Sequence, residues 1–297
     1  GCDMMKKEYA GLHAALVTPY TETGEVNYRE LKKLVRRLIA EGIDGFYVGG
    51  STAETFLLTE SERKGILEAV LEENNGEKLV VSHVGAISTR QAVDFAQHAE
   101  AAGTDAVSAI SPFYYKFTQR EIEDYYLEIM AGSGLPMFVY NFPNLSGFAL
   151  TDPFLERLKS SSRLAGIKFT SSDMFQLERI KARNPGLTVW NGFDEMLLSG
   201  LAAGADGGVG STYNCLLPLV RGVYDRFRAG DPARALAFQR RANEAIEVIC
   251  RHGVFASVKK LLEYSGIESH GCRRPFSPLS PEGEAELRRV YETHLAR

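Results

Sequence analysis

The sequence has 297 residues and an ordinary globular composition, with 44% hydrophobic and 24% charged side chains. Its 34 basic and 38 acidic side chains give a net charge of −4, so no basic field favours nucleic acid or a membrane surface as a partner. The longest apolar runs are also much shorter than the roughly 20 residues that a membrane-spanning helix needs.

The four cysteines, at positions 2, 215, 250 and 272, form no CxxC pair. A chain of this length does not need disulfides to fold, and its first residues, GCDMMKKEY, lack the apolar core of a signal peptide. We therefore expect free thiols and a cytoplasmic location.

Short apolar segments of strand-like composition recur about every 25–35 residues along the chain. They span residues 13–19, 44–50, 79–85, 105–112, 135–143, 164–172, 187–193 and 206–212. Amphipathic, charged stretches separate them; in the first, residues 28–42, the side chains of Leu31, Leu34, Leu38 and Ile39 fall on one helical face. Gly42, Gly103 and Gly204 stand where three of these helices should end.

Strands that alternate with helices indicate a parallel sheet joined by crossover connections. A doubly wound sheet would also fit this alternation, but it usually has fewer strands, so eight units by about residue 229 favour a closed (β/α)8 TIM barrel over residues 8–229. Residues 230–297 contain only helical patterns. The sequence therefore predicts an α/β barrel followed by a C-terminal helical cap.

Active sites of such barrels lie at the carboxyl ends of the strands, and this rule selects the candidate residues. The polar or glycine residues at those ends are Thr18, Gly49, Gly50, Ser51, Thr52, Tyr114, Tyr140, Asn141, Lys168, Gly192, Asp194, Glu195, Gly210, Ser211 and Thr212.

Lys168 carries the most chemical information, because it ends an apolar strand. A lysine that points into a barrel mouth is desolvated, which lowers its pKa and frees the amine to act as a nucleophile. The alternatives are a surface lysine at a strand end or a lysine paired with Asp194 or Glu195.

Tyr140 ends the neighbouring strand, where its phenol could pass protons to and from a substrate hydroxyl or simply pack at the rim. The glycine turn before Ser51 and Thr52 offers N–H groups and two hydroxyls to an anion such as a carboxylate, or it is only a tight turn that needs positive φ.

Asp194 and Glu195 could act as acid and base, bind hydroxyls, or form a charge pair at a helix N-terminus. Residues 207–211 weakly resemble the phosphate-binding position of many barrels.

The histidines, at 13, 83, 98, 252, 270 and 294, show neither HxH nor HExxH spacing, so we expect no metal and treat His13 and His83 as core residues. No Ser–His–Asp arrangement is indicated at the strand ends.

Several motifs together resemble the N-acetylneuraminate lyase/dihydrodipicolinate synthase superfamily. They are GIDGFYVGGSTAETF, DAVSAISPFYY, YNFP, GIKFTSSD, GADGGVGSTYN and the tail CRRPFSP, and the similarity runs from about residue 12 to 276. Ala53 stands where the family motif GSTGE usually has its second glycine. The dihydrodipicolinate synthase branch usually carries an arginine shortly after the YNxP motif, but this sequence continues with Asn144, Leu145, Ser146 and Gly147.

The missing arginine, with the segments NGFDE and GGVGSTYN, makes the resemblance closest to the N-acetylneuraminate lyase branch. It implies reversible cleavage of N-acetylneuraminate to N-acetylmannosamine and pyruvate through a Schiff base on Lys168, with Tyr140 as proton carrier and no cofactor. It also implies that the substrate-binding residues are Ser51, Thr52, Thr170, Gly192, Asp194, Glu195 and Ser211. Ser51 and Thr52 would hold the carboxylate, and Thr170 would line the pocket beside the lysine.

The resemblance further implies a homotetramer, in which Tyr114, from the aromatic run Phe113, Tyr114 and Tyr115, reaches a neighbouring subunit's site. The alternatives are another pyruvate-dependent aldolase of the same family, a metal-dependent or phosphate-binding barrel enzyme, and a barrel without catalytic activity.

Overall fold

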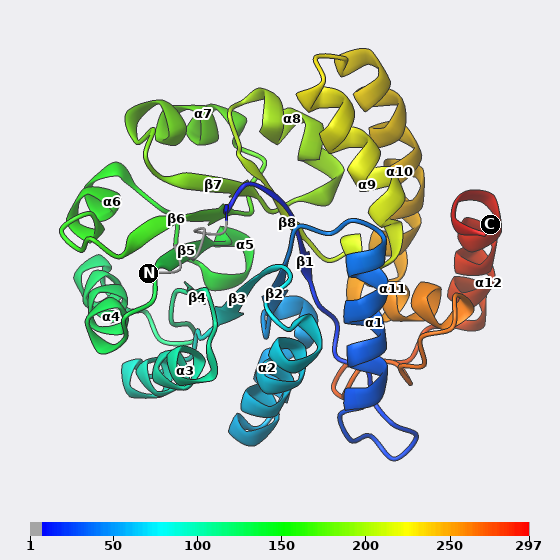
Figure 1. The fold of residues 1–297 in the computed structure, drawn as a ribbon, viewed down its shortest axis with the longest axis horizontal. Helices are drawn as coiled ribbons and strands as arrows, with labels where there is room; N and C mark the ends of the chain where they lie inside the picture. Colours follow the sequence, from blue (N-terminus) through cyan, green and yellow to red (C-terminus); the bar gives the residue numbers. More distant parts are fainter. Residues whose placement is uncertain (1–7, 297) are drawn as a thin grey trace.

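The computed structural model describes residues 8–296 and contains the predicted barrel. Eight parallel strands close in chain order, β1 to β8, with β8 pairing back onto β1 (Figure 1). The strands are β1 Gly11–Ala15, β2 Gly45–Val48, β3 Leu79–His83, β4 Ala106–Ile110, β5 Met137–Asn141, β6 Leu164–Phe169, β7 Thr188–Asn191 and β8 Gly207–Gly210. The prediction of a (β/α)8 barrel, rather than a doubly wound sheet, is confirmed.

Helices surround the barrel, one or more after each strand (Figure 1). They are α1 Tyr28–Ala40, α2 Glu60–Asn74, α3 Thr89–Ala102, α4 Gln119–Gly132, the short α5 Pro143–Ser146, α6 Asp152–Leu158, α7 Met174–Arg183, α8 Leu197–Ala202 and α9 Tyr213–Arg228.

Helix α1 shows how the sequence specifies this ring. The Asn27 side chain accepts a hydrogen bond from the Glu30 backbone N–H and caps the first turn. Leu31, Leu34 and Leu38 of the predicted face are fully buried, and Ile39 lies at its partly buried edge. The three glycines expected at helix ends all have positive φ, which few other residues adopt at low cost.

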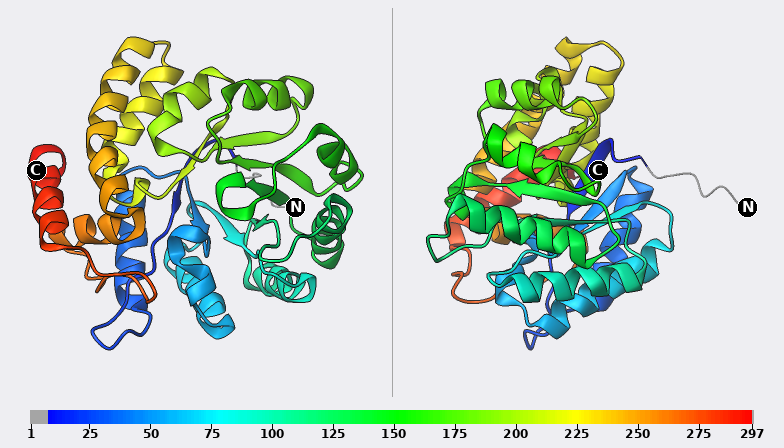
Figure 2. Two further views of the ribbon diagram at one scale, coloured as in Figure 1. Left: turned by 180° about the vertical axis from the view of Figure 1, so that it is seen from behind. Right: turned by 90° about the vertical axis from the view of Figure 1, so that its left-hand side faces the viewer.

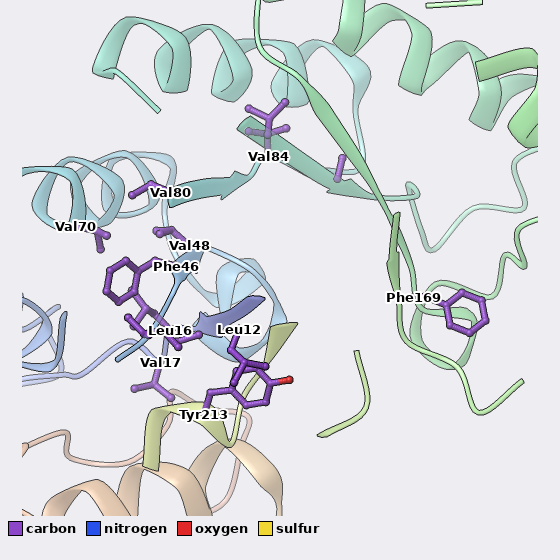
Figure 3. Close-up of a cluster of buried hydrophobic side chains, with 14 of the residues drawn as sticks. Leu12, Leu16, Val17, Phe46, Val48, Val70, Val80, Val84, Phe169 and Tyr213 are labelled. Atoms are coloured by element: carbon purple, nitrogen blue, oxygen red, sulfur yellow. The ribbon is translucent and has the colours of Figure 1, made fainter. Parts of the chain in front are cut away.

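Two apolar layers hold the barrel together. Figure 3 shows the outer one, in which Leu12, Phe46 and Val80 of neighbouring strands and Val70 of α2 are packed between strands and helices. The inner layer fills the barrel, where the rings of Phe138 and Trp190 stack with centroids 3.9 Å apart.

Gly166 makes this stack possible. A Cβ there would lie 2.7 Å from the Phe138 ring and 2.1 Å from the Thr188 carbonyl oxygen. Trp190 Nε1 donates a hydrogen bond at 2.8 Å to the carbonyl oxygen of Tyr9, just before β1, so the stack lies toward the beginnings of the strands. The prediction that His13 and His83 are core residues is confirmed, because both side chains are buried.

The C-terminal helices lie together on one side of the barrel, next to α9 and α1 (Figures 1 and 2). They are α10 Pro232–His252, α11 Val254–Tyr264 and α12 Pro281–Val290, followed by a π-helical turn, Tyr291–Leu295. The helical extension is confirmed. The expected boundary after residue 229 falls between α9 and α10, and the division into two domains stays a prediction. Within residues 8–296, no helix is both long and apolar enough to cross a membrane.

Candidate active site

Lys168 lies on β6 and points into the barrel mouth, directly across from Tyr140 of β5 in the sheet register. Its side chain is nearly inaccessible, with 5% of the residue exposed, and its Nζ lies 4.1 Å from the ring centroid of Tyr47 and 4.0 Å from that of Tyr140. Burial lowers the pKa of Lys168 from 10.5 to about 7, although the Asp194 carboxylate acts in the opposite direction. The structure therefore excludes a surface lysine and gives an amine that is partly uncharged at neutral pH.

Tyr140 is buried beside this amine. Burial raises the pKa of its phenol to about 12, against the opposing effect of the Ser51 hydroxyl, whose Oγ lies 3.5 Å from Tyr140 Oη. The resting phenol is therefore protonated, next to a partly neutral amine. A proton donor therefore lies beside a potential nucleophile, with Lys168 Nζ 4.0 Å from the centroid of the Tyr140 ring.

Tyr47 of β2 belongs to the same cluster and was not among the predicted residues. Its hydroxyl donates a hydrogen bond to Ser108 Oγ at 2.9 Å, which leaves its ring beside Lys168 Nζ. Alternation along residues 45–48 places Tyr47 on the interior face, and that signal could have found it.

The loop after β2 brings two hydroxyls to the same place. Gly49 has a φ of 76°, and a Cβ on Gly50 would lie 2.7 Å from the Tyr47 ring, so both glycines are needed. The chain then forms a 3-10 turn, Ser51–Ala53, and Thr52 Oγ1 lies 2.6 Å from Ser211 Oγ of the loop after β8.

Ala53, the departure from the family motif, fits this loop without conflict. It is the last residue of the turn and is absent from the positions with positive φ; the left-handed residue is the next one, Glu54. The Thr18 hydroxyl donates a hydrogen bond to the Ala53 carbonyl oxygen at 2.8 Å, which ties the loops after β1 and β2 together.

Asp194 and Glu195 follow β7 in a short 3-10 turn, Asp194–Met196. Asp194 Oδ2 accepts hydrogen bonds from the backbone N–H of Thr212 at 2.8 Å and from its hydroxyl. Burial raises the pKa of Asp194 to about 7 despite these bonds. Part of this carboxylate is therefore engaged with the loop after β8.

Gly192 precedes this pair at a point of close approach. A Cβ at Gly192 would lie 1.9 Å from the Oγ1 atom of Thr170, so no larger side chain fits without moving the end of β6. The polypeptide backbone, rather than a side chain, forms this part of the site.

A cavity of about 300 Å³ joins these residues at the carboxyl ends of the strands. Every predicted catalytic or substrate-binding residue except Tyr114 lines it: Lys168, Tyr140, Ser51, Thr52, Thr170, Gly192, Asp194, Glu195 and Ser211. Tyr114 lies outside; it is 85% exposed, and its φ of 75° is unusual for a residue with a side chain.

The cavity also has an apolar wall that the sequence reasoning missed. It comes from α5, α10, α11 and the loops after β5 and β7, through Phe142, Leu145, Phe193, Ile246, Ile249, Cys250, Val254 and Phe255. The sequence predicted helices after residue 230, but nothing in that pattern indicated that part of α10 would cover the barrel mouth. Among residues 8–296, no three His, Cys, Asp or Glu side chains meet in a way that could hold a metal ion.

Comparison with known proteins identifies one family and several similar proteins. The Dihydrodipicolinate synthetase family matches residues 8–294. N-acetylneuraminate lyase of Citrobacter koseri is 42% identical over 290 residues, which cover 97% of this chain and 98% of the relative. N-acetylneuraminate lyase of Salmonella typhimurium is 43% identical over 277 residues, 93% of each chain.

Solved structures agree over nearly the whole length. CdNal from Clostridium difficile, crystallised in complex with mannosamine, has a TM-score of 0.94 and 32% identity, covering 97% of this chain and 100% of that chain. N-acetylneuraminate lyase from Fusobacterium nucleatum complexed with pyruvate has a TM-score of 0.92 and 31% identity, with 97% of both chains covered.

Proposed function

The chain belongs to the dihydrodipicolinate synthetase family, as its motifs predicted, and we propose that it is a lyase that cleaves N-acetylneuraminate reversibly to N-acetylmannosamine and pyruvate. The observation that carries this proposal is the buried amine of Lys168, with a pKa lowered to about 7, at the base of a cavity lined by hydroxyls and carboxylates. A neutral amine can attack a ketone, and the polar lining suits a substrate with many hydroxyl groups.

The reaction begins when the neutral Lys168 amine attacks the C2 ketone of the open-chain sugar acid and forms a carbinolamine. Tyr140 donates its phenolic proton to the departing hydroxyl, so water leaves and an iminium forms beside a phenolate. The phenolate is unfavourable alone, which is why the pKa of Tyr140 is raised, but the new positive charge stabilises it.

Cleavage then uses the same two groups. The Tyr140 phenolate accepts the proton of the C4 hydroxyl, the C3–C4 bond breaks, and its electron pair moves toward the iminium to give an enamine. N-acetylmannosamine leaves as the aldehyde. Tyr140 returns its proton to C3, water adds to the iminium and gives one proton back to the Tyr140 phenolate, and collapse of the carbinolamine releases pyruvate and the neutral Lys168 amine. The lysine itself supplies the electron sink, so the scheme uses no cofactor.

Substrate binding follows from the placement of the polar groups. We assign the pyruvoyl carboxylate to Ser51 and Thr52, which lie beside Tyr140 and Ser211. We assign the hydroxyl chain of the sugar to Gly192, Asp194, Glu195 and Ser211, which line the other part of the cavity. Thr170 lies next to the lysine on the loop after β6.

Assembly and location are also part of the proposal. Tyr114 and Tyr115 are 85% and 65% exposed, and a row of exposed aromatic side chains is typical of a protein interface. We propose a homotetramer in which Tyr114 enters a neighbouring subunit's site. The described cysteines, Cys215, Cys250 and Cys272, are free thiols, which suits the proposed cytoplasmic location. Cys2 lies outside the described residues.

A product assay tests the proposed substrate directly. Purified protein with N-acetylneuraminate should release pyruvate and N-acetylmannosamine, whereas pyruvate with aspartate semialdehyde should condense little, because the residues directly after the YNFP motif include no arginine to bind a second carboxylate. Faster reaction with the semialdehyde, or with another sugar acid, would replace the proposed substrate by that one while leaving the Schiff-base chemistry in place.

A further inference from the structure

Glu54 has an unusual conformation immediately after the proposed carboxylate-binding residues. Its φ of 61° and ψ of 37° are left-handed, and it joins two 3-10 turns, Ser51–Ala53 and Thr55–Leu57. Residues with a Cβ adopt this conformation at a cost, and they keep it only where the surroundings enforce it. The carboxylate of Glu54 is buried, so the enforcing contacts lie inside the protein.

Those contacts come from the C-terminal part of the chain, more than 200 residues away. Lys259 Nζ on α11 lies 2.5 Å from Glu54 Oε2, and the two side chains are 1% and 0% exposed. The backbone N–H of Arg273 donates to Glu54 Oε1 at 2.7 Å. The Lys259 ammonium also donates to the Gly271 carbonyl oxygen and lies 4.2 Å from the ring centroid of Tyr20. Both carboxylate oxygens are therefore held by the segment that follows the barrel.

The same residue is bonded to the turn that carries the two hydroxyls. The backbone N–H of Glu54 donates to the carbonyl oxygen of Ser51 at 2.9 Å and closes the turn Ser51–Ala53. A shift of Glu54 would therefore move Ser51 and Thr52 with it. Burial of an ion pair costs desolvation free energy, and well-packed apolar residues in the same place often give equal or greater stability. In this protein the ion pair between Glu54 and Lys259 imposes a single geometry on the loop after β2.

We infer that Glu54 and Lys259 are positioning residues, which lock the carboxylate-binding loop after β2 to helix α11 and thereby set the affinity for the pyruvoyl group. The inference rests on the proposed function in one respect, the assignment of Ser51 and Thr52 to the substrate carboxylate. Neither side chain lines the cavity, so they act through the loop rather than on the substrate.

The chain offers a matched control for this pair. Glu123 of α4 is also buried and pairs with Arg157 of α6 at 3.2 Å; Arg157 also pairs with Asp124 at 2.7 Å, and none of these three residues lines the cavity. We would compare Lys259→Met with Arg157→Met and Glu54→Gln with Glu123→Gln, and would add the double variant Glu54→Gln/Lys259→Met, which removes both buried charges together. The readouts are the Michaelis constants for pyruvate and for N-acetylmannosamine in the condensation direction, the rate of the borohydride-trapped pyruvate adduct, and the unfolding temperature.

Lys259→Met should raise KM for pyruvate about tenfold or more. Displacement of a binding group by a fraction of an ångström to 1 Å can reduce catalytic efficiency by up to about 100-fold. KM for N-acetylmannosamine should change by less than about threefold, and Glu54→Gln, which keeps the shape of the side chain, should have a smaller effect of the same kind. The control variants should lower the unfolding temperature without changing KM for pyruvate.

Equal changes in both Michaelis constants, or a pyruvate constant no different from that of the controls, would overturn the inference. It would also be overturned if neither Lys259→Met nor the double variant folds while the controls do, because the pair would then serve the whole fold. The wild-type protein separates this from the proposed function: if it forms no pyruvate adduct in the same assay, the proposed function itself is wrong.

Discussion

Replacing Lys168 by methionine should stabilise the folded protein at neutral pH, even though it removes the proposed nucleophile. Methionine has a similar length and no charge, whereas the wild-type fold buries an amine whose pKa is lowered from 10.5 to about 7. The unfolded chain binds more protons than the folded one between these two values, so this lysine destabilises the wild-type protein fully below pH 7 and ceases to do so above pH 10.5. At about 1.4 kcal/mol per pKa unit, the cost is roughly 4 kcal/mol at pH 7 and about 1 kcal/mol at pH 9.5.

The assay is urea unfolding of the wild type and Lys168→Met at pH 7 and pH 9.5, at one fixed protein concentration because assembly would shift the midpoint. The variant should gain several kcal/mol at pH 7 and much less at pH 9.5. Lys64→Met, at a partly exposed ion pair with Asp94 on the outer helices, should change stability by less than about 1 kcal/mol at either pH. A Lys168→Met protein that is less stable than the wild type at pH 7, or whose gain does not shrink with rising pH, would refute the account of a desolvated amine.

The remaining predictions concern the cavity and the assembly. Tyr140→Phe should still form the pyruvate adduct but cleave sugar about 10²–10⁴-fold more slowly, and an unchanged kcat would contradict its role as proton carrier. Glu195→Ala should weaken kcat/KM for N-acetylneuraminate by about 1–3 kcal/mol and leave adduct formation with pyruvate intact; equal loss of both would show a general disturbance of the site. Gly192→Ala should impair turnover, because its Cβ would overlap Thr170 Oγ1; wild-type kinetics would show that the backbone there is not required. Light scattering at micromolar concentration should give the mass of a tetramer, and a monomeric mass would contradict the assembly.

The barrel could be predicted from the sequence because its signals are local. Each strand is a short apolar segment, and helix α1 shows its buried face through Leu31, Leu34 and Leu38. The rule that barrel sites lie at the carboxyl ends of strands then selected Lys168 and Tyr140, which the sheet register places side by side. The family motifs added Thr170.

Other features depend on contacts between distant segments, which periodicity does not report. The apolar wall formed by residues such as Ile249 and Phe255 depends on the direction in which α10 and α11 pack, and that direction is set by tertiary contacts. The ion pair between Glu54 and Lys259 joins residues 205 positions apart. The bonds from Thr212 to Asp194 likewise cross from the loop after β8 to the loop after β7, so the sequence indicated an acidic pair but not that one member is partly engaged within the protein.

The most direct test of the central claim is to trap the Schiff base and locate it. Purified protein should be treated with pyruvate and borohydride, measured by intact mass, and digested so that the modified peptide can be sequenced by tandem mass spectrometry. We expect one reduced pyruvoyl adduct per chain, on Lys168, and no adduct on Lys168→Met. Absence of an adduct on the wild-type protein, or an adduct on a different lysine, would contradict the proposed mechanism.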